Sequence, residues 1–277
     1  MRIYNNTNSV GIQNTLTTTS ANMTKSLEKL SSGLRINRAS DDAAGLSVSE
    51  GLRSQIRGSS MAQRNANDGI AMLQIAESGS QQITDSLQRM RELAVQASNG
   101  TYTNTDRGYI QQEYAALASE VNRIAGATTY NGVQLLSTAS AFSFQISAAS
   151  SGSSSTISFN PTTAGFSSSV NLSTGLSFGG VSLQSSATSA ISSIDTILGS
   201  VLSLRSTIGS TMNRLEATVS NLGDSITNLT DADSRIRDTD FAYESMQFTK
   251  NQILTQSAQS MLAQANQLPS AVLSLLK

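Results

Sequence analysis

The longest regular pattern in the sequence is a run of apolar residues spaced three and four positions apart in the second half of the chain. Arg205 is its one charged position, and its members are Ile191, Ile194, Leu198, Val201, Arg205, Ile208, Met212, Leu215, Val219, Leu222, Ile226 and Leu229. This spacing is typical of a helix that packs along its whole length in a coiled coil or bundle. From residue 191 to about 235 such a helix would be roughly 65 Å long, because each residue adds about 1.5 Å.

Two shorter patterns of the same kind occur in the first half of the chain. One consists of Leu73, Ala76, Ile83, Leu87, Met90, Ala94 and Ala97, and the next of Ile110, Tyr114, Leu117, Val121 and Ile124. Asn99-Gly100 lies between them and predicts a helix end, because glycine readily adopts the left-handed conformation that follows many last turns. We therefore expect three antiparallel helices that share one narrow core.

The middle of the chain has a different pattern. Between Ile124 and Ile194 there is no charged residue, and Ser, Thr and Gly separate short apolar alternations at Val133/Leu135, Phe142/Phe144/Ile146, Ile157/Phe159 and Val170/Leu172. Alternation favours short strands, and Asn131-Gly132 favours a tight turn, although so much serine leaves a flexible linker open. The expected fold class is mainly α, a long antiparallel helical rod or coiled-coil bundle with a small β-hairpin element in the middle of the chain.

Both ends of the chain are free of charge, from Ile3 to Thr24 and from Asn251 to Leu276. Helices without charge on any side are normally buried on all sides, yet within one molecule these two can cover only each other. We therefore expect them to bind further copies of the chain and to be mobile until they do. The expected self-association residues are Leu16, Met23, Leu27, Leu30, Leu34, Leu254, Met261, Leu268, Val272 and Leu275.

Composition excludes several classes of function. Aromatic residues make up only 5% of the chain, which favours thin helix packing, and a net charge of −1 argues against a nucleic-acid partner. Because His and Cys are absent, no His-based catalytic site and no His or Cys zinc site can form, so we expect no enzyme, metal or cofactor. No run approaches 18 apolar residues and the start lacks the apolar core of a cleaved signal peptide, so we expect no membrane insertion.

Five segments of the sequence resemble those of one family. They are EKLSSGLRINRASDDAAGL at 28–46, LQRMRELAVQASNG at 87–100, YNGVQLL at 130–136, SRIRDTDFAYE at 234–244 and MLAQANQLPSAVLSLL at 261–276. In content and order they resemble bacterial flagellins, the subunits of the flagellar filament. The resemblance covers about residues 1–145 and 185–277 and is weakest over 146–184.

The resemblance implies a division of the chain. Residues 1–44 would form an N-terminal inner-tube helix that pairs with a C-terminal one, 234–277. Residues 45–140 and 185–233 would form the two parts of an outer helical rod, and 141–184 a short Ser/Thr-rich variable β region. The inner helix would enter the rod at a polar joint that sets geometry more than stability, since exposed ion pairs contribute about 0–1 kcal/mol each. Its residues would be Arg35, Arg38, Asp41, Asp42, Arg235, Arg237, Asp238 and Asp240.

The resemblance also implies a function and partners. The chain would be a secreted structural subunit that polymerises into the hollow extracellular filament used for swimming. Its partners would be copies of itself, the type III flagellar export apparatus, an export chaperone, and the cap and hook-junction proteins. A vertebrate Toll-like flagellin receptor would bind Arg89, Leu93 and Glu113. Candidate O-glycosylation positions are Ser151, Ser153, Ser154, Ser155, Ser167, Ser168 and Ser169.

Two other functions fit parts of the sequence. A hook–filament junction protein would share the terminal heptads, although such proteins usually lack the full set of central motifs. A secreted helical interaction protein could instead use its amphipathic ends to bind a membrane or a host receptor. The terminal helices have almost no Lys or Arg, which argues against this last function because interfacial helices usually carry a basic face.

Overall fold

A computed structural model describes residues 6–137, 141–148, 155–161 and 180–275, without the side chains of 268–275. The chain divides into two compact units, Arg57–Ile226 on one side and Met1–Ile56 with Thr227–Lys277 on the other. Expected strand residues Val170 and Leu172 lie outside the described residues.

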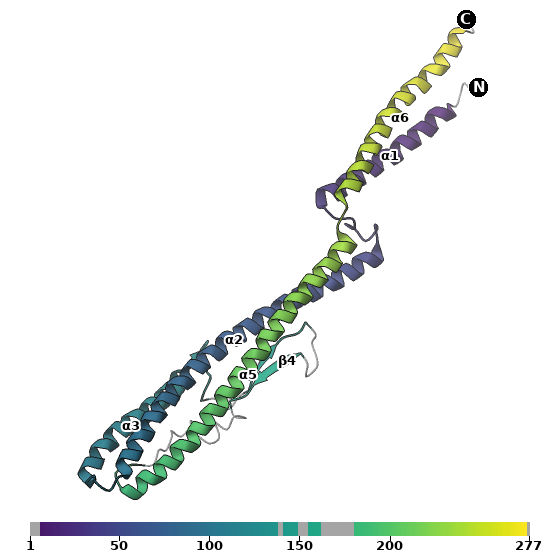
Figure 1. The fold of residues 1–277 in the computed structure, drawn as a ribbon. Helices are drawn as coiled ribbons and strands as arrows, with labels where there is room; N and C mark the ends of the chain where they lie inside the picture. Colours follow the sequence, from purple (N-terminus) through teal and green to yellow (C-terminus); the bar gives the residue numbers. More distant parts are fainter. Residues whose placement is uncertain (1–5, 138–140, 149–154, 162–179, 276–277) are drawn as a thin grey trace. The chain divides into compact units, whose positions relative to one another are not determined.

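The unit Arg57–Ile226 is built on three long helices, α2 (Ala43–Ser98), α3 (Asn104–Ala127) and α5 (Gln184–Arg237), which lie side by side in Figure 1. Gln184 contacts the carbonyl of Ser98, whereas further along α5 Arg205 contacts Glu77. Residue numbers rise on α5 as they fall on α2, so the two helices are antiparallel. The expected mainly α, antiparallel rod is confirmed.

The core of this unit follows the predicted seams, with one difference in rotation. Ile194, Val201, Ile208 and Leu215 are fully buried as expected. Four other positions share the buried stripe with them: Ala190, Ile197, Leu204 and Thr211. Four residues that we expected in the stripe are only partly buried at its edge: Ile191, Leu198, Met212 and Val219. Arg205 lies on that edge as well, where its guanidinium makes a 2.7 Å ion pair with Glu77. The charged residue in the seam is therefore accommodated at its margin.

The turn between α2 and α3 is held by an arginine that the sequence analysis did not single out. Arg107 is 6% exposed and donates hydrogen bonds to the backbone carbonyls of Ala97 and Asn99 at 2.8 and 3.0 Å. These carbonyls end α2 and have no partner inside the helix, so the guanidinium caps them. Thr103 and Asp106 form a capping box at the start of α3. The predicted break at Asn99-Gly100 is confirmed.

Two small antiparallel sheets follow α3. Strands β1 (Thr129–Tyr130) and β2 (Val133–Gln134) are joined by Asn131 and Gly132, both with positive φ, as the predicted tight turn requires. Strands β3 (Phe142–Gln145) and β4 (Thr156–Phe159) pair in register, and the rings of Phe142 and Phe159 stack at 6.3 Å. The predicted strands in this part of the chain are confirmed, and the alternative of a flexible linker is wrong for the residues that form them.

The β3–β4 pair packs directly on α2 through a glycine. A Cβ atom on Gly69 would lie 2.9 Å from the ring of Phe144, and the Asn65 amide donates to the carbonyl of Gln145. Phe159 and Ile157 complete the contact with the helical core. The small residue at position 69 therefore sets how closely the aromatic strand can approach.

The other unit contains a second helix pair, α1 (Thr7–Ser32) and α6 (Phe241–Leu275), which run side by side in Figure 1. Contacts at the two ends of the pair fix an antiparallel direction: Ser9 donates to the side chain of Asn266, and Lys29 lies 3.7 Å from Glu244. The unit also holds the first turns of α2 and the last turns of α5.

Helix α5 is, among the helices of the described ranges, the one long and apolar enough to cross a membrane by length and composition. Its apolar window has a mean hydropathy of 1.3. The side chains responsible include Ile194, Val201 and Leu204, which are fully buried in the bundle core. These apolar side chains of α5 thus pack in the core with α2 and α3.

Two glycine substitutions test the packing of the β3–β4 pair. We expect Gly69→Ala to lower the free energy of unfolding by about 1–3 kcal/mol, because the new methyl group would overpack against Phe144. A Cβ atom on Gly209 of α5 would have no atom within 4 Å. Gly209→Ala should therefore raise the free energy of unfolding by about 0.5–1 kcal/mol, because alanine favours the helix. Urea unfolding followed by circular dichroism measures both, and equal effects would contradict this packing.

Candidate assembly surface and polar joint

The contact between α1 and α6 is made by small and polar side chains. The residues buried in it are Thr19, Ser26, Glu244, Ala258 and Ala265, each between 5% and 8% exposed. At the N-terminal end of α1 the side-chain amide of Asn6 donates a hydrogen bond to the carbonyl of Ala265. A seam of this composition lets two backbones approach closely but buries little apolar surface, so it stabilises the pair weakly.

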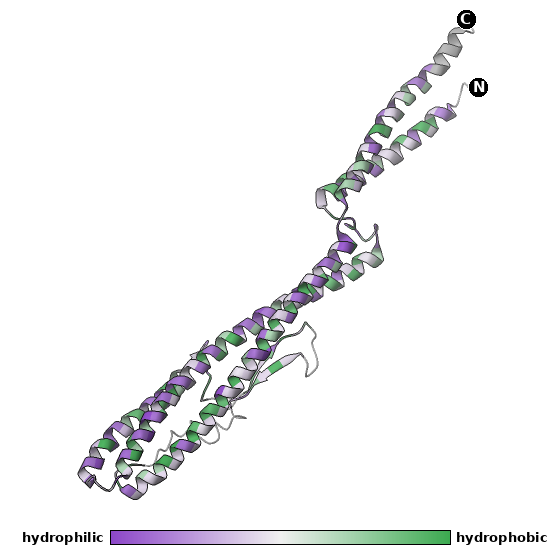
Figure 2. Cartoon of the chain, viewed as in Figure 1, coloured by the Kyte–Doolittle hydropathy of each residue, from purple (hydrophilic) through white to green (hydrophobic). Residues whose placement is uncertain are grey.

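Several of the larger apolar side chains of the pair lie on its outside, whereas others such as Leu16, Met23 and Leu30 are partly buried. Val10, Leu27, Met246, Ile253 and Met261 are between 55% and 60% exposed, and Figure 2 shows polar and apolar positions mixed along both helices. Met246, Ile253 and Leu254 also line a shallow hollow on α6 of about 540 Å³. The pair therefore presents an apolar surface that nothing within its own unit covers.

The expected self-association residues divide between these two environments. Leu27, Leu254 and Met261 are exposed, while Leu16, Met23, Leu30 and Leu34 are partly buried. Leu268, Val272 and Leu275 lie beyond the described side chains. Sequence analysis missed Ile253 and Met246, because a single heptad line was traced along a helix whose apolar residues lie on several sides.

A polar joint connects the segment after α1 with the segment between α5 and α6. Leu34 and Asp238 form an isolated antiparallel bridge, in which the N–H of Arg35 donates to the carbonyl of Arg237 and that of Thr239 to the carbonyl of Gly33. The two distances are 2.6 and 3.0 Å. Gly33 makes this path possible, because its φ of +72° ends α1 in the left-handed conformation.

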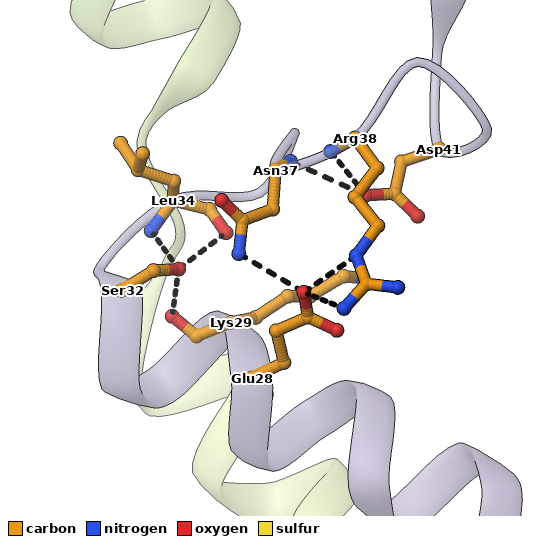
Figure 3. Close-up of polar contacts among 7 residues, drawn as sticks. All are labelled: Glu28, Lys29, Ser32, Leu34, Asn37, Arg38 and Asp41. Carbon is orange, nitrogen blue, oxygen red and sulfur yellow. Dashed lines mark hydrogen bonds and ion pairs between the residues drawn. The ribbon is translucent and has the colours of Figure 1, made fainter.

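The arginines of the joint do not bind the aspartates of the opposite segment. Arg35 crosses the joint, but its guanidinium donates to the backbone carbonyl of Ile236 at 2.7 Å. Arg38 turns back to Glu28 on α1, whose carboxylate also accepts from the Asn37 amide (Figure 3). Within the described part of the chain, no ion pair joins 35–42 to 235–240. Arg35 is therefore satisfied by a backbone carbonyl and Arg38 by the Glu28 carboxylate, and backbone hydrogen bonds join the two segments.

The aspartates of the joint cap local turns. Asp41 accepts from the backbone N–H groups of Arg38 and Asn37, and these two bonds hold the pKa of its carboxyl below the usual value. Asp42 accepts from the N–H of Gly45 at the start of α2, and Asp240 accepts from two N–H groups at the start of α6. Each carboxylate thus satisfies free amides at a helix start or loop.

The remaining charges bind across the helices next to the joint. Arg237 makes a 3.0 Å ion pair with Glu50 on α2 and thereby lowers the pKa of that carboxyl. The hydroxyl of Ser49, a fully buried residue, donates a hydrogen bond to Asp233 at 2.6 Å. Asp238 accepts a hydrogen bond from the hydroxyl of Ser234, and Arg235 is exposed. Sequence analysis missed Glu28, Ser49 and Glu50. That Glu28 is the only acidic residue in α1 was a usable signal.

The expected receptor residues are brought together only in part. Arg89 on α2 makes a 2.9 Å ion pair with Glu113 on α3 and a second one with Glu92, and both partners are about half exposed. Leu93 is 2% exposed and belongs to the core between the helices. The expectation that Leu93 forms part of a surface contact is therefore wrong for this fold.

The candidate glycosylation serines are mostly outside the described residues. Ser151, Ser153, Ser154, Ser167, Ser168 and Ser169 all fall there. Ser155 is described and is 6% exposed at the start of β4, where its carbonyl accepts from the N–H of Ile146. Ser155 is thus a poor acceptor for a sugar, because its position next to the paired strand hides it.

Comparison with known proteins places these features in one family. Residues 3–141 match the bacterial flagellin N-terminal helical region, and residues 191–276 match the bacterial flagellin C-terminal helical region. The chain is 42% identical to flagellin FlaB2 of Treponema pallidum, over 100% of both chains. It is 46% identical to a flagellin of Halalkalibacterium halodurans, over 91% of each.

One solved structure, of a Vibrio parahaemolyticus protein described as flagellar hook-associated, is similar in fold, with a TM-score of 0.56 over 72% of this chain and 100% of that one. At 14% identity it supports the helical architecture alone. The family models and the relatives together establish that this chain belongs to the bacterial flagellin family.

Proposed function

We propose that this chain is the structural subunit of an extracellular flagellar filament, and that it assembles through the apolar outer surface of the α1–α6 pair. The observation that carries the proposal is the placement of Leu27, Met246, Ile253 and Met261 on the outside of two helices that carry few charges. The family supports the same function, because its members are flagellins.

The energetics of the pair favour assembly over isolation. A large apolar side chain contributes about 1.5–3 kcal/mol when it is buried, and several of them remain exposed around one thin seam. Ordering each residue of the pair costs about 1–2 kcal/mol, which a seam of Thr, Ser and Ala offsets poorly. The helices would therefore become fully ordered as neighbouring copies cover them. Contacts between unlike surfaces, repeated with a rotation that does not close into a ring, would generate a helical filament.

The polar joint would separate the assembling helices from the rod. The division proposed from the sequence places 1–44 and 234–277 in an inner tube, with 45–140 and 185–233 in an outer rod and 141–184 as a short variable region. The helix breaks after Ser32 and Arg237 support those boundaries, although the compact units divide after Ile56 within α2 and after Ile226 within α5. Backbone bonds at Gly33, Arg35 and Thr239 would hold the two helices that leave the joint in a fixed relation.

Delivery to the filament would require export of the chain. Passage through a type III flagellar export apparatus would suit a subunit whose terminal helices are only weakly stable before assembly. An export chaperone would cover α6 until the chain is exported. Cap and hook-junction proteins would be its neighbours at the two ends of the filament.

A hook-associated protein is the nearer alternative. The structural similarity to such a protein is at 14% identity and therefore shows the fold alone. The 42% and 46% identities to flagellins over nearly complete chains favour a filament subunit. They also disfavour an unrelated secreted interaction protein.

Recognition by a vertebrate Toll-like flagellin receptor is a second function that one observation favours. Arg89 and Glu113 form an exposed ion pair on adjacent helices, so both polar groups are available to a partner. Because Leu93 is buried, the receptor would bind the polar pair and the exposed side chains around it.

Truncation tests the assembly proposal. A chain that ends at Gln264 should not extend filament seeds at concentrations where the full chain does, because it lacks the apolar end of α6. Electron microscopy measures filament growth. The matched control lacks only Lys277 and should grow normally, and both should retain the urea unfolding transition of the rod. Long filaments from the chain ending at Gln264 would contradict the proposal.

Substitution of one arginine tests receptor recognition. In a receptor reporter assay on monomer, Arg89→Ala should activate at least about tenfold less than the parent, since truncating a buried interface ion pair typically costs more than 1.4 kcal/mol. The matched control is Arg123→Ala on α3, which removes an arginine of comparable exposure and its Glu120 ion pair. Equal activation by the two variants would exclude Arg89 as a contact.

A further inference from the structure

Five methionines of the chain occupy two contrasting environments. Met72 and Met90 are buried in the rod core, at 5% and 0% exposed. Met246 and Met261 on α6 are 57% and 60% exposed, and Met61 on α2 is 49% exposed. Oxidation of methionine sulfur depends on access, so a single chain contains protected and reactive sites.

Met246 and Met261 belong to the same surface stripe of α6. They are fifteen residues apart with Ile253 between them, so around the helix Ile253 lies roughly 20° from Met246, and Met261 lies roughly 60° from Met246 on the other side. Ile253 is itself 60% exposed, and Met246, Ile253 and Leu254 line the same hollow. The two sulfur atoms are thus part of the surface that the proposed function assigns to subunit contact.

We propose that Met246 and Met261 form an oxidation site through which hydroperoxides block addition of the subunit to a filament. This inference rests on the proposed function, because it requires α6 to be covered during assembly. In the free chain both thioethers are open to solvent. In the filament a neighbouring copy would cover and protect them, so the site senses oxidant only before assembly.

The chemistry needs only a hydroperoxide as co-reactant. The thioether sulfur attacks the outer peroxide oxygen, an S–O bond forms and the O–O bond breaks. With hydrogen peroxide the products are methionine sulfoxide and water, so sulfur loses two electrons and the peroxide gains them. The reaction is reversed by methionine sulfoxide reductases, one for each sulfoxide epimer.

The product is poorly suited to a buried contact. A sulfoxide is polar and accepts hydrogen bonds, whereas the thioether it replaces is a flexible apolar group. Burying an unpaired polar group opposes association. Because both sites lie on one stripe, a neighbouring chain would meet two such groups at once.

The test compares seeded filament growth before and after treatment of purified chain with hydrogen peroxide. Peptide mass spectrometry should find Met246 and Met261 oxidised in free chain and at least about tenfold more slowly in filaments, with Met72 and Met90 protected in both. Oxidised chain should require at least about a tenfold higher concentration to extend seeds. Treatment with both reductases and a dithiol as electron donor should restore growth.

Substitutions identify the sites responsible. The double variant Met246→Leu/Met261→Leu keeps apolar volume and should extend seeds after peroxide treatment. The matched control Met61→Leu removes a methionine that is 49% exposed from α2, and this variant should remain sensitive. Loss of growth in the oxidised double variant, or normal growth of parent oxidised at both sites, would overturn this inference. Failure of untreated parent to extend seeds would instead contradict the proposed function.

Discussion

Two helices placed side by side can bury only one face each, and this limit governs the α1–α6 pair. Its seam contains Thr19, Ser26, Ala258 and Ala265, while larger apolar residues such as Ile253 remain exposed. In water such an arrangement exposes apolar surface that a third and fourth helix would cover in a bundle. A subunit that obtains those helices from its neighbours converts an incomplete fold into an assembly interface, which makes folding of the ends and polymerisation a single process.

The rod shows what the same chain does when three helices are available. Around α5 the buried stripe contains Ile194, Val201 and Leu204, and charges such as Arg205 are accommodated at its edge by a partner on α2. The β3–β4 pair covers α2 where Gly69 allows a close approach. This unit can therefore be stable alone, whereas in the other unit backbone bonds at Gly33 and Arg35 join the segment that follows α1 to the segment that precedes α6.

The features predicted correctly from sequence are those that repeat along the chain or follow from local backbone chemistry. The long helices follow from regular apolar spacing, and the turn at Asn131-Gly132 follows from residues that tolerate positive φ. The rotation of the α5 seam was not predicted accurately, because Ile191 and Leu204 are equally apolar and only the position of the partner helices distinguishes them. For the same reason the burial of Leu93 was missed. The segments that form the joint were identified from sequence, but their hydrogen bonds were not. Every residue has a backbone carbonyl, so a sequence does not show which carbonyl an arginine such as Arg35 will bind.

Hydrogen exchange by mass spectrometry, compared between free chain and filament, tests the link between folding and assembly most directly. In the free chain we expect amides of α1 and α6 to exchange within seconds to minutes, while the amides around Ile194 and Ile208 stay protected. In filaments the amides of α1 and α6 should become protected to at least the level of the rod. Strong protection of α1 and α6 in the free chain, unchanged on assembly, would show that the pair is stable alone and would contradict our interpretation.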